Sequence, residues 1–185
     1  MQMEIKILRS GRKTLSLEIT KEAKVLVRAP YQMKESEIED FIQEKSDWIA
    51  EHLEIIQGKL AKRAAVPRMS MEEVHKLADE AVRVLPGKAA YYAPIAGVTY
   101  GRITIRNQRT RWGSCSGKGN LNFNCLLMLA PEEVQDYVVV HELCHRLEMN
   151  HSPEFWKEVE RVLPDYRTAK QWLKEHGDEL MGRIS

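Results

Sequence analysis

The sequence predicts an α+β protein built in two parts. Three observations predict it: short alternating apolar runs at the N-terminus, helical apolar periods that follow capping signals, and a switch to strand-like patterns near residue 98. A length of 185 residues with 43% hydrophobic residues is enough for one sizeable core and a small satellite. We expect residues 1–60 to form a small antiparallel β-meander with an amphipathic helix, and residues 61–185 to form the larger domain.

The first part begins with apolar runs in residues 3–28 that are separated by polar or glycine-containing stretches. This pattern is typical of a three-stranded antiparallel meander, which Ala29-Pro30 ends. Residues 36–39 (SEIE) have the pattern of a capping box and open a helical apolar period, so we expect an amphipathic helix over 36–57. Residues 58–67 have no clear period, and we interpret them as a linker.

The second part opens with another capping box, from Ser70 to Glu73, and a helix that we expect Pro86-Gly87 to interrupt. Residues 98–106 and 120–129 are predicted strands, and the glycine-rich residues 113–119 between them predict a hairpin with an extended loop. Pro131 and the acids after it predict the start of an apolar, buried helix. Two further helices are expected over 153–163 and 165–178.

Composition excludes several classes of protein. There are 28 basic and 27 acidic side chains, and charges break up every apolar run before the roughly 18 residues that a membrane span needs. The N-terminus lacks the pattern of a secretory signal, so we expect a cytoplasmic protein without a membrane anchor. The three cysteines have no C-x-x-C spacing, which predicts reduced thiols; they are Cys115, Cys125 and Cys144.

The near-zero net charge hides an uneven distribution along the chain. Residues 1–80 hold 14 basic and 15 acidic groups, and residues 132–185 hold 7 basic and 12 acidic groups. Residues 81–131 hold 7 basic groups and no acidic group. We favour the interpretation that these cations pair with the acidic C-terminal helices; a surface for an anionic partner is the alternative.

The chemistry is concentrated in residues 141–145, which read HELCH. Histidines four residues apart lie on one face of a helix, so both imidazoles of His141 and His145 can reach one ion, and Glu142 can address a water held by that ion. An accidental H-E-x-x-H is expected only about 0.02 times in a chain of this composition. A metal ion would also satisfy polar groups on a helix that is apolar nearly all round. The alternative is that the histidines are core residues that only form hydrogen bonds.

A third ligand is expected shortly after this motif. His151 is the first choice, because Asn150 can adopt a left-handed turn that swings the chain back under the metal, before Ser152 caps a new helix. The alternatives are the carboxylates of Glu148, Glu154 and Glu158. Three imidazoles favour zinc over other divalent ions.

Four segments together resemble the YgjP-like family of metal-dependent hydrolases, within the zincin peptidase superfamily. They are RTRWGSCS at 109–116, LNFN at 121–124, YVVVHELCH at 137–145 and NHSPEFW at 150–156. The family is related to the SprT-like and WLM zinc proteases. The resemblance implies a zincin-like catalytic domain in residues 61–185, with zinc on His141, His145 and His151 and with Glu142 as the catalytic carboxylate.

The arginine-rich residues before the glycine-rich loop have two interpretations. Arg109 and Arg111 can bind a carboxylate or phosphate of the substrate, or stabilise charge on a reacting oxygen. Alternatively, they pair with the acidic helices while Trp112 fills the core. Cys115 is read as a packed thiol rather than a nucleophile. Three aromatic residues at helical spacing are expected in the core: Phe155, Trp156 and Trp172.

Taken together, the residues predict a zinc-dependent metallopeptidase that hydrolyses peptide bonds with Glu142 as general base. A zinc-dependent hydrolase of nucleotide phosphoanhydrides is one alternative, because the same chemistry can attack phosphorus. An SprT-like protease associated with nucleic acid is another. A net charge of +1 without aromatic-basic repeats argues against nucleic-acid binding, so we expect a peptide or protein substrate, with a nucleotide as the alternative.

Overall fold

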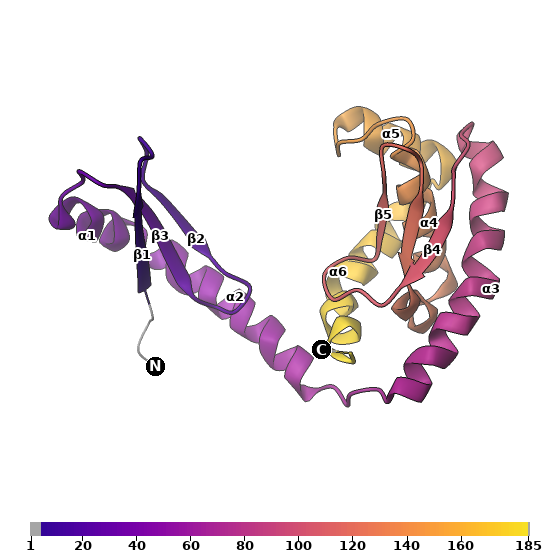
Figure 1. The fold of residues 1–185 in the computed structure, drawn as a ribbon, viewed down its shortest axis with the longest axis horizontal. Coiled ribbons are helices and arrows are strands. Elements are labelled where there is room, and N and C mark those ends of the chain that lie inside the picture. Colours follow the sequence, from indigo (N-terminus) through magenta and orange to yellow (C-terminus); the bar gives the residue numbers. More distant parts are fainter. Residues whose placement is uncertain (1–4, 185) are drawn as a thin grey trace. The chain divides into compact units, whose positions relative to one another are not determined.

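A computed structural model describes residues 5–184 of the chain. The chain divides into two compact units, residues 1–65 and 66–185 (Figure 1). The described residues have an α+β fold with six α-helices and two three-stranded mixed sheets. None of the described helices is long and apolar enough to cross a membrane. Each unit has its own hydrophobic cluster, so each is described separately.

The sheet of the N-terminal unit contains β1 (Ile5–Ser10), β2 (Ser16–Ile19) and β3 (Val25–Pro30) in the order β1-β3-β2. Strand β2 pairs antiparallel with β3, whereas β1 pairs parallel with β3. The expected all-antiparallel meander is therefore wrong. The reason is burial: the strand with the most deeply buried apolar residues occupies the centre of the sheet. Those residues are Val25, Val27 and Ala29.

Two helices cover this sheet, α1 (Glu35–Glu44) and α2 (Ser46–Ala65). The expected single helix over 36–57 is wrong because the chain leaves helical geometry at Lys45. The expected capping box is also wrong, since Glu37 accepts a hydrogen bond from the backbone N–H of Lys34 instead (2.9 Å). The predicted linker 58–67 is helical up to Ala65, because Gly58 costs a helix of good helix formers only about 1 kcal/mol.

The C-terminal unit begins with α3 (Met71–Ala96), and here the predicted capping box is confirmed. Glu73 N–H donates to Ser70 Oγ (3.2 Å), and Ser70 N–H donates to the Glu73 carboxylate (2.7 Å). The predicted interruption at Pro86-Gly87 is wrong, because α3 continues through both Pro86 and Pro94. The buried face of the helix offsets the lost hydrogen bonds. That face contains Val74, Leu77, Ala81, Leu85, Ala89, Ala93 and Ala96.

The second sheet contains β4 (Ile103–Arg106), β5 (Gly113–Cys115) and β6 (Leu121–Asn124) in the order β4-β6-β5. The expected hairpin between residues 98–106 and 120–129 is wrong, because β4 pairs parallel with β6. The hairpin partner of β6 is β5, within the predicted glycine-rich loop. Residues 125–129 form a short 3-10 helix, η1, capped by Asn124. The burial of the three consecutive residues Cys125, Leu126 and Leu127 explains the change, since alternate residues of a strand point to opposite faces of its sheet.

Three helices complete the unit, as the sequence predicts: α4 (Glu132–Cys144), α5 (Pro153–Val162) and α6 (Tyr166–Gly182). Helix α4 lies at the centre of the unit (Figure 1), where it packs against α3, α5, α6 and β5. Eight of its thirteen residues are buried, in agreement with its nearly continuous apolar character. The helix that bears the metal-ligand motif is therefore held rigidly from all sides.

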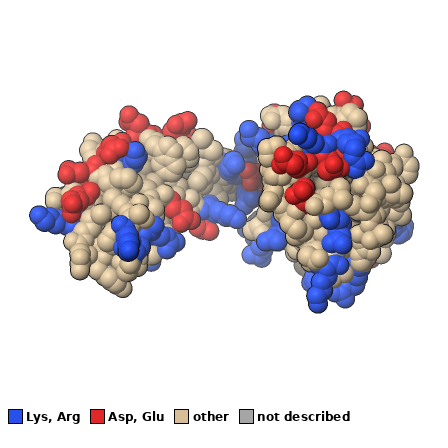
Figure 2. Space-filling view, turned by 90° about the horizontal axis from the view of Figure 1, so that it is seen from above, with Lys and Arg blue, Asp and Glu red and all other residues tan. Residues whose placement is uncertain are grey.

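Among the described residues, most cations of residues 81–131 do not pair with the acidic C-terminal helices, so the favoured interpretation is wrong for them. Within the described part of the chain, only Lys88 of the seven forms an ion pair, with Glu132 and Asp136 (2.9 and 2.6 Å). In Figure 2, a group of basic side chains on the C-terminal unit lies apart from the acidic ones. Six of the seven cations therefore do not support the interpretation that they pair with the acidic C-terminal helices.

Candidate metal centre

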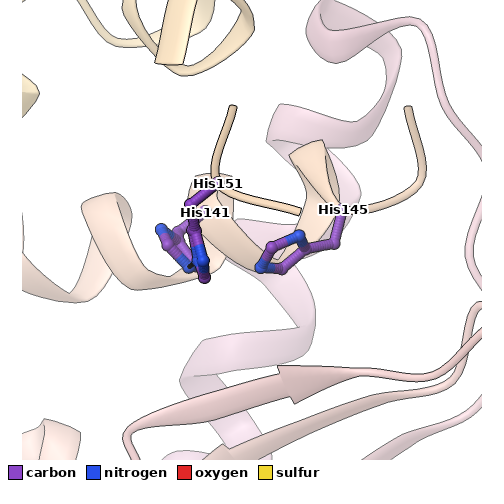
Figure 3. A group of neighbouring side chains, drawn as sticks. All are labelled: His141, His145 and His151. Carbon is purple, nitrogen blue, oxygen red and sulfur yellow. Dashed lines mark hydrogen bonds between the residues drawn. The ribbon is translucent and has the colours of Figure 1, made fainter. Parts of the chain in front are cut away.

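Three histidine side chains converge at the C-terminal end of α4. Candidate ligand atoms of His141, His145 and His151 all lie within 4.8 Å of one another. The Nε2 atoms of His141 and His151 are 3.0 Å apart. Figure 3 shows the rings of these two residues side by side, with the ring of His145 turned toward them. The histidine motif and the residue predicted as third ligand therefore come together in space.

The local fold explains why His151 returns to α4. The turn after α4 is closed by backbone hydrogen bonds from Leu147 and Glu148 to the Cys144 carbonyl. The expected left-handed conformation of Asn150 is wrong, because Ala23 is the only described non-glycine residue with positive φ. Instead, the Asn150 carboxamide oxygen accepts a hydrogen bond from Ser152 N–H (3.0 Å), an Asx-turn that redirects the chain into α5.

The three rings are positioned by their surroundings. The Glu148 carbonyl lies 2.9 Å from His145 Nδ1, which fixes that ring and leaves its Nε2 for an ion. Phe155 stacks against His145 with ring centroids 4.6 Å apart and an interplanar angle of 29°. Trp156 stacks against His151 at 5.8 Å and 25°. Two of the three predicted core aromatics, Phe155 and Trp156, thus form a wall of the site.

Burial favours the neutral form of two of the three histidines, His141 and His151. It is the main cause that lowers the pKa of His141 to about 3, and the charges of His145, His151 and Lys170 lower it further. Burial, together with the charges of His145 and Lys170, also lowers the pKa of His151. A neutral imidazole is the form that binds a metal ion.

The distance between the facing nitrogens of His141 and His151 is close to that in a tetrahedral metal site. Two nitrogen ligands at zinc bond lengths in tetrahedral geometry are separated by about 3.3 Å, close to the 3.0 Å between the facing Nε2 atoms. Such close nitrogens repel unless a proton or a cation lies between them. The buried Nδ1 of His141 has no hydrogen-bond partner within the described chain. Three imidazoles are a donor set suited to zinc and other late transition metals.

The Glu142 carboxylate is buried, with 5% of the residue exposed. It packs against the backbone of Gly113 in β5, where an added Cβ would lie 2.5 Å from its Oε1. Burial raises the pKa of Glu142 to about 8, while the Arg111 charge and a hydrogen bond from the Cys115 backbone oppose this. Sequence reasoning missed Gly113, because the contact joins two elements that are far apart in the chain.

The alternative third ligands lie elsewhere. Glu148 contributes its backbone carbonyl to His145. Glu158 pairs with Arg161 on its own helix (2.7 Å), and Glu154 is an exposed residue in the first turn of α5. The cluster of possible ligands in the described chain contains the three histidines alone.

The predicted substrate-binding arginines lie on the loop before β5. Both Arg109 and Arg111 are exposed, and the charge of Arg111 acts on Glu142. The buried Asn124 holds this loop, since its carboxamide donates to the carbonyls of Gln108 (2.7 Å) and Arg111 (3.1 Å). Sequence reasoning missed Asn124, although a polar residue in an apolar strand is a signal that could have identified it.

Cys115 is half-buried beside this site. Burial raises the pKa of its thiol, and the negative charge of Glu142 adds to this. A thiol with a raised pKa is a poor nucleophile at neutral pH. The interpretation of Cys115 as a packed thiol agrees with this environment.

A buried helix with two histidines one turn apart, a glutamate beside the first and a third histidine nearby is the site of the H-E-x-x-H metallopeptidases. Comparison with known families agrees. The chain matches the model of the YgjP-like, metallopeptidase domain over residues 13–84 and 74–176, and it belongs to this family.

Two solved structures are similar to the chain. The metallopeptidase zymogen abylysin of Pyrococcus abyssi is 25% identical with a TM-score of 0.47, and the match covers 55% of this chain and 100% of that one. The metallopeptidase zymogen jannalysin of Methanocaldococcus jannaschii is 19% identical with a TM-score of 0.43, covering 50% and 94%. No curated protein matches the chain.

Proposed function

We propose that the protein is a zinc-dependent peptidase in which His141, His145 and His151 hold the ion and Glu142 is the general base. The observation that carries the proposal is that ligand atoms of the three imidazoles lie within 4.8 Å of one another, at the end of the buried helix that bears Glu142. Membership of a metallopeptidase family supports a protein or peptide substrate.

The residues have separate tasks in this proposal. When bound, zinc would act as a Lewis acid toward a water molecule and a peptide carbonyl. The carboxylate of Glu142 accepts the proton of the attacking water and returns it to the nitrogen of the leaving amine. Gly113 and the Cys115 backbone hold this carboxylate in one position. Arg111 and Arg109, exposed on the loop, contact an anionic group of the substrate.

The test compares peptide hydrolysis by the wild type and the Glu142→Gln variant, both loaded with zinc. The amide cannot accept the proton, so we expect at least a 100-fold loss of kcat with unchanged zinc content. Nucleoside triphosphates serve as the competing substrate class. Full peptide hydrolysis by the variant, or hydrolysis of nucleotides in place of peptides by the wild type, would contradict the proposal.

A further inference from the structure

Lys170 on α6 places a positive charge beside the histidine cluster. Its Nζ lies 3.6 Å from the centroid of the Trp156 ring, and the face of an aromatic ring attracts a cation. Trp156 in turn stacks against His151 at 5.8 Å. The ammonium group of this exposed lysine therefore lies over an aromatic ring that lines the site.

The electrostatics of the site agree with this position. Burial is the main cause of the lowered pKa of His141 and of His151, and the Lys170 charge contributes to both. Lys170 is thus close enough to act on two of the three histidines, although it is distant from them in sequence. Neither its helical position nor its exposure distinguishes it from other surface lysines in the sequence.

A neighbouring cation shows what is unusual about Lys170. Arg167 lies over the ring of Tyr166, which stacks on Trp156, but its Nη1 bonds to the Glu160 carboxylate at 2.7 Å. Within residues 5–184, no carboxylate forms an ion pair with Lys170. Of the two cations on this aromatic stack, only Lys170 is available to a carboxylate from outside the chain.

We propose that Lys170 is a substrate-binding residue that makes the peptidase prefer peptides with a carboxylate next to the scissile bond. This inference rests on the proposed function. An aromatic ring attracts the ammonium without neutralising it, so an incoming carboxylate meets a positioned, unpaired charge. Arg111, on the loop before β5, adds a second positive charge that acts on the site, at Glu142. An exposed pair of this kind is worth about a three- to fivefold preference.

The experiment measures kcat and KM for peptides that differ only by Glu or Gln beside the scissile bond, with amidated C-termini. The wild type should cleave the Glu peptide with a three- to fivefold higher kcat/KM, through KM, and salt should reduce the difference. Lys170→Gln should remove the preference, so that kcat/KM for the Glu peptide equals kcat/KM for the Gln peptide. Lys170→Arg should restore it. The matched control is Lys174→Gln, an exposed lysine one turn further along α6, which should keep the preference.

A second pair of peptides distinguishes the two sources of the carboxylate. Both have neutral side chains, and one has a free C-terminus close to the scissile bond while the other is amidated. A Lys170-dependent preference for the free C-terminus assigns the lysine to the terminal carboxylate, and a preference for Glu assigns it to an acidic side chain. A preference that survives Lys170→Gln, or an equal loss of kcat on every peptide, would overturn the proposal.

A binding measurement separates this inference from the proposed function. Calorimetry of the Glu and Gln peptides with the Glu142→Gln variant should show tighter binding of the Glu peptide, and the additional Lys170→Gln change should abolish the difference. If the wild type cleaves no peptide but this difference is present, the peptidase proposal fails and the carboxylate site stands. Equal binding of both peptides overturns the carboxylate site.

Discussion

At the scale of single residues, the absence of a side chain at Gly113 determines where the proposed base, Glu142, can lie. Glu142 projects from α4 toward β5, and the missing side chain of Gly113 makes room for its carboxylate. The Cys115 backbone of the same strand donates a hydrogen bond to that carboxylate. This bond lowers the pKa of Glu142 and so opposes the increase that burial causes. The sheet therefore takes part in the site although it contributes no ligand.

The first prediction concerns Gly113. In Gly113→Ala the new Cβ would lie 2.5 Å from Glu142 Oε1, so the carboxylate must move away from its position. We expect at least a tenfold loss of kcat with unchanged zinc content, measured by peptide hydrolysis and metal analysis. The control is Gly117→Ala, where nothing lies within 4 Å of the added Cβ. Equal activities of the two variants would remove Gly113 from the account.

At this scale, the sequence predicts the residues that belong to a chemical motif. It does not predict residues whose role depends on contacts between separate helices and strands. The spacing of His141 and His145 predicts their shared helix face from helix geometry alone, with Glu142 next to the first of them. Gly113 and Lys170 act across elements, so their positions depend on how a strand and a helix pack against α4. No local pattern contains that information.

At the scale of elements, the packing of α3 against α4 includes a polar network. Lys88 of α3 bonds to Glu132 and Asp136 of α4, and its side chain is only 12% exposed. Burial lowers the pKa of Lys88, but the hydrogen bonds that Lys88 donates to Asp136 and Glu132 outweigh this and raise the pKa overall. Burial, together with the Asp136 charge, raises the pKa of Tyr92 to about 12.

The second prediction follows from the titration of Tyr92. Its folded-state pKa is higher than the unfolded value of about 10, so its contribution to stability is present below pH 10 and is lost between pH 10 and 12. We expect Tm to fall in this window, and to fall less in Tyr92→Phe. Thermal unfolding followed by circular dichroism measures both. The matched variant Tyr91→Phe alters an exposed neighbour, and an equal effect there would contradict the assignment.

The third prediction concerns the start of α5, where the Ser152 hydroxyl accepts a hydrogen bond from Phe155 N–H at 3.3 Å. Ser152→Ala should cost about 1 kcal/mol of unfolding free energy and weaken zinc binding, because the cap fixes the residue after His151. Ser70→Ala removes the equivalent cap of α3 away from the site. It should cost a similar amount and leave zinc affinity unchanged. Equal zinc affinities of both variants would show that the cap does not position His151.

The sequence predicts the helices and strands better than it predicts how the strands pair. The helices around the site follow from apolar periods and caps, as Ser70 and Pro153 illustrate. The order of each sheet does not follow, because β3 and β6 become central strands through burial that neighbouring residues cannot reveal. Pro86 shows the same limit: its local preference ends a helix, but the buried face of α3 keeps the helix continuous.

At the scale of the whole molecule, two hydrophobic clusters define two units. One contains Ile38 and Ile49 with the central strand of the first sheet. The other surrounds α4 and includes the aromatic residues beside the candidate metal centre. The hydrogen bond from Met69 N–H to the Arg183 carbonyl (2.8 Å) closes the second unit, because it joins the segment before α3 to the residues after α6.

The fourth prediction is that the second unit folds alone. A fragment of residues 66–185 retains its own core, the Met69–Arg183 hydrogen bond and all three histidines. We expect a single cooperative unfolding transition that zinc shifts to higher temperature. A fragment that lacks such a transition with zinc present would show that residues 1–65 are needed to form the site.

The most direct test of the central claim is the metal content per chain, measured by mass spectrometry after zinc loading and dialysis. The account predicts about one zinc per wild-type chain, no zinc in His141→Ala, and none or weakly held zinc in His151→Ala. His176→Ala, which changes an exposed histidine outside the cluster, should keep the metal. A wild-type chain that binds no metal, or a His141→Ala variant that binds as much as the wild type, would contradict the account.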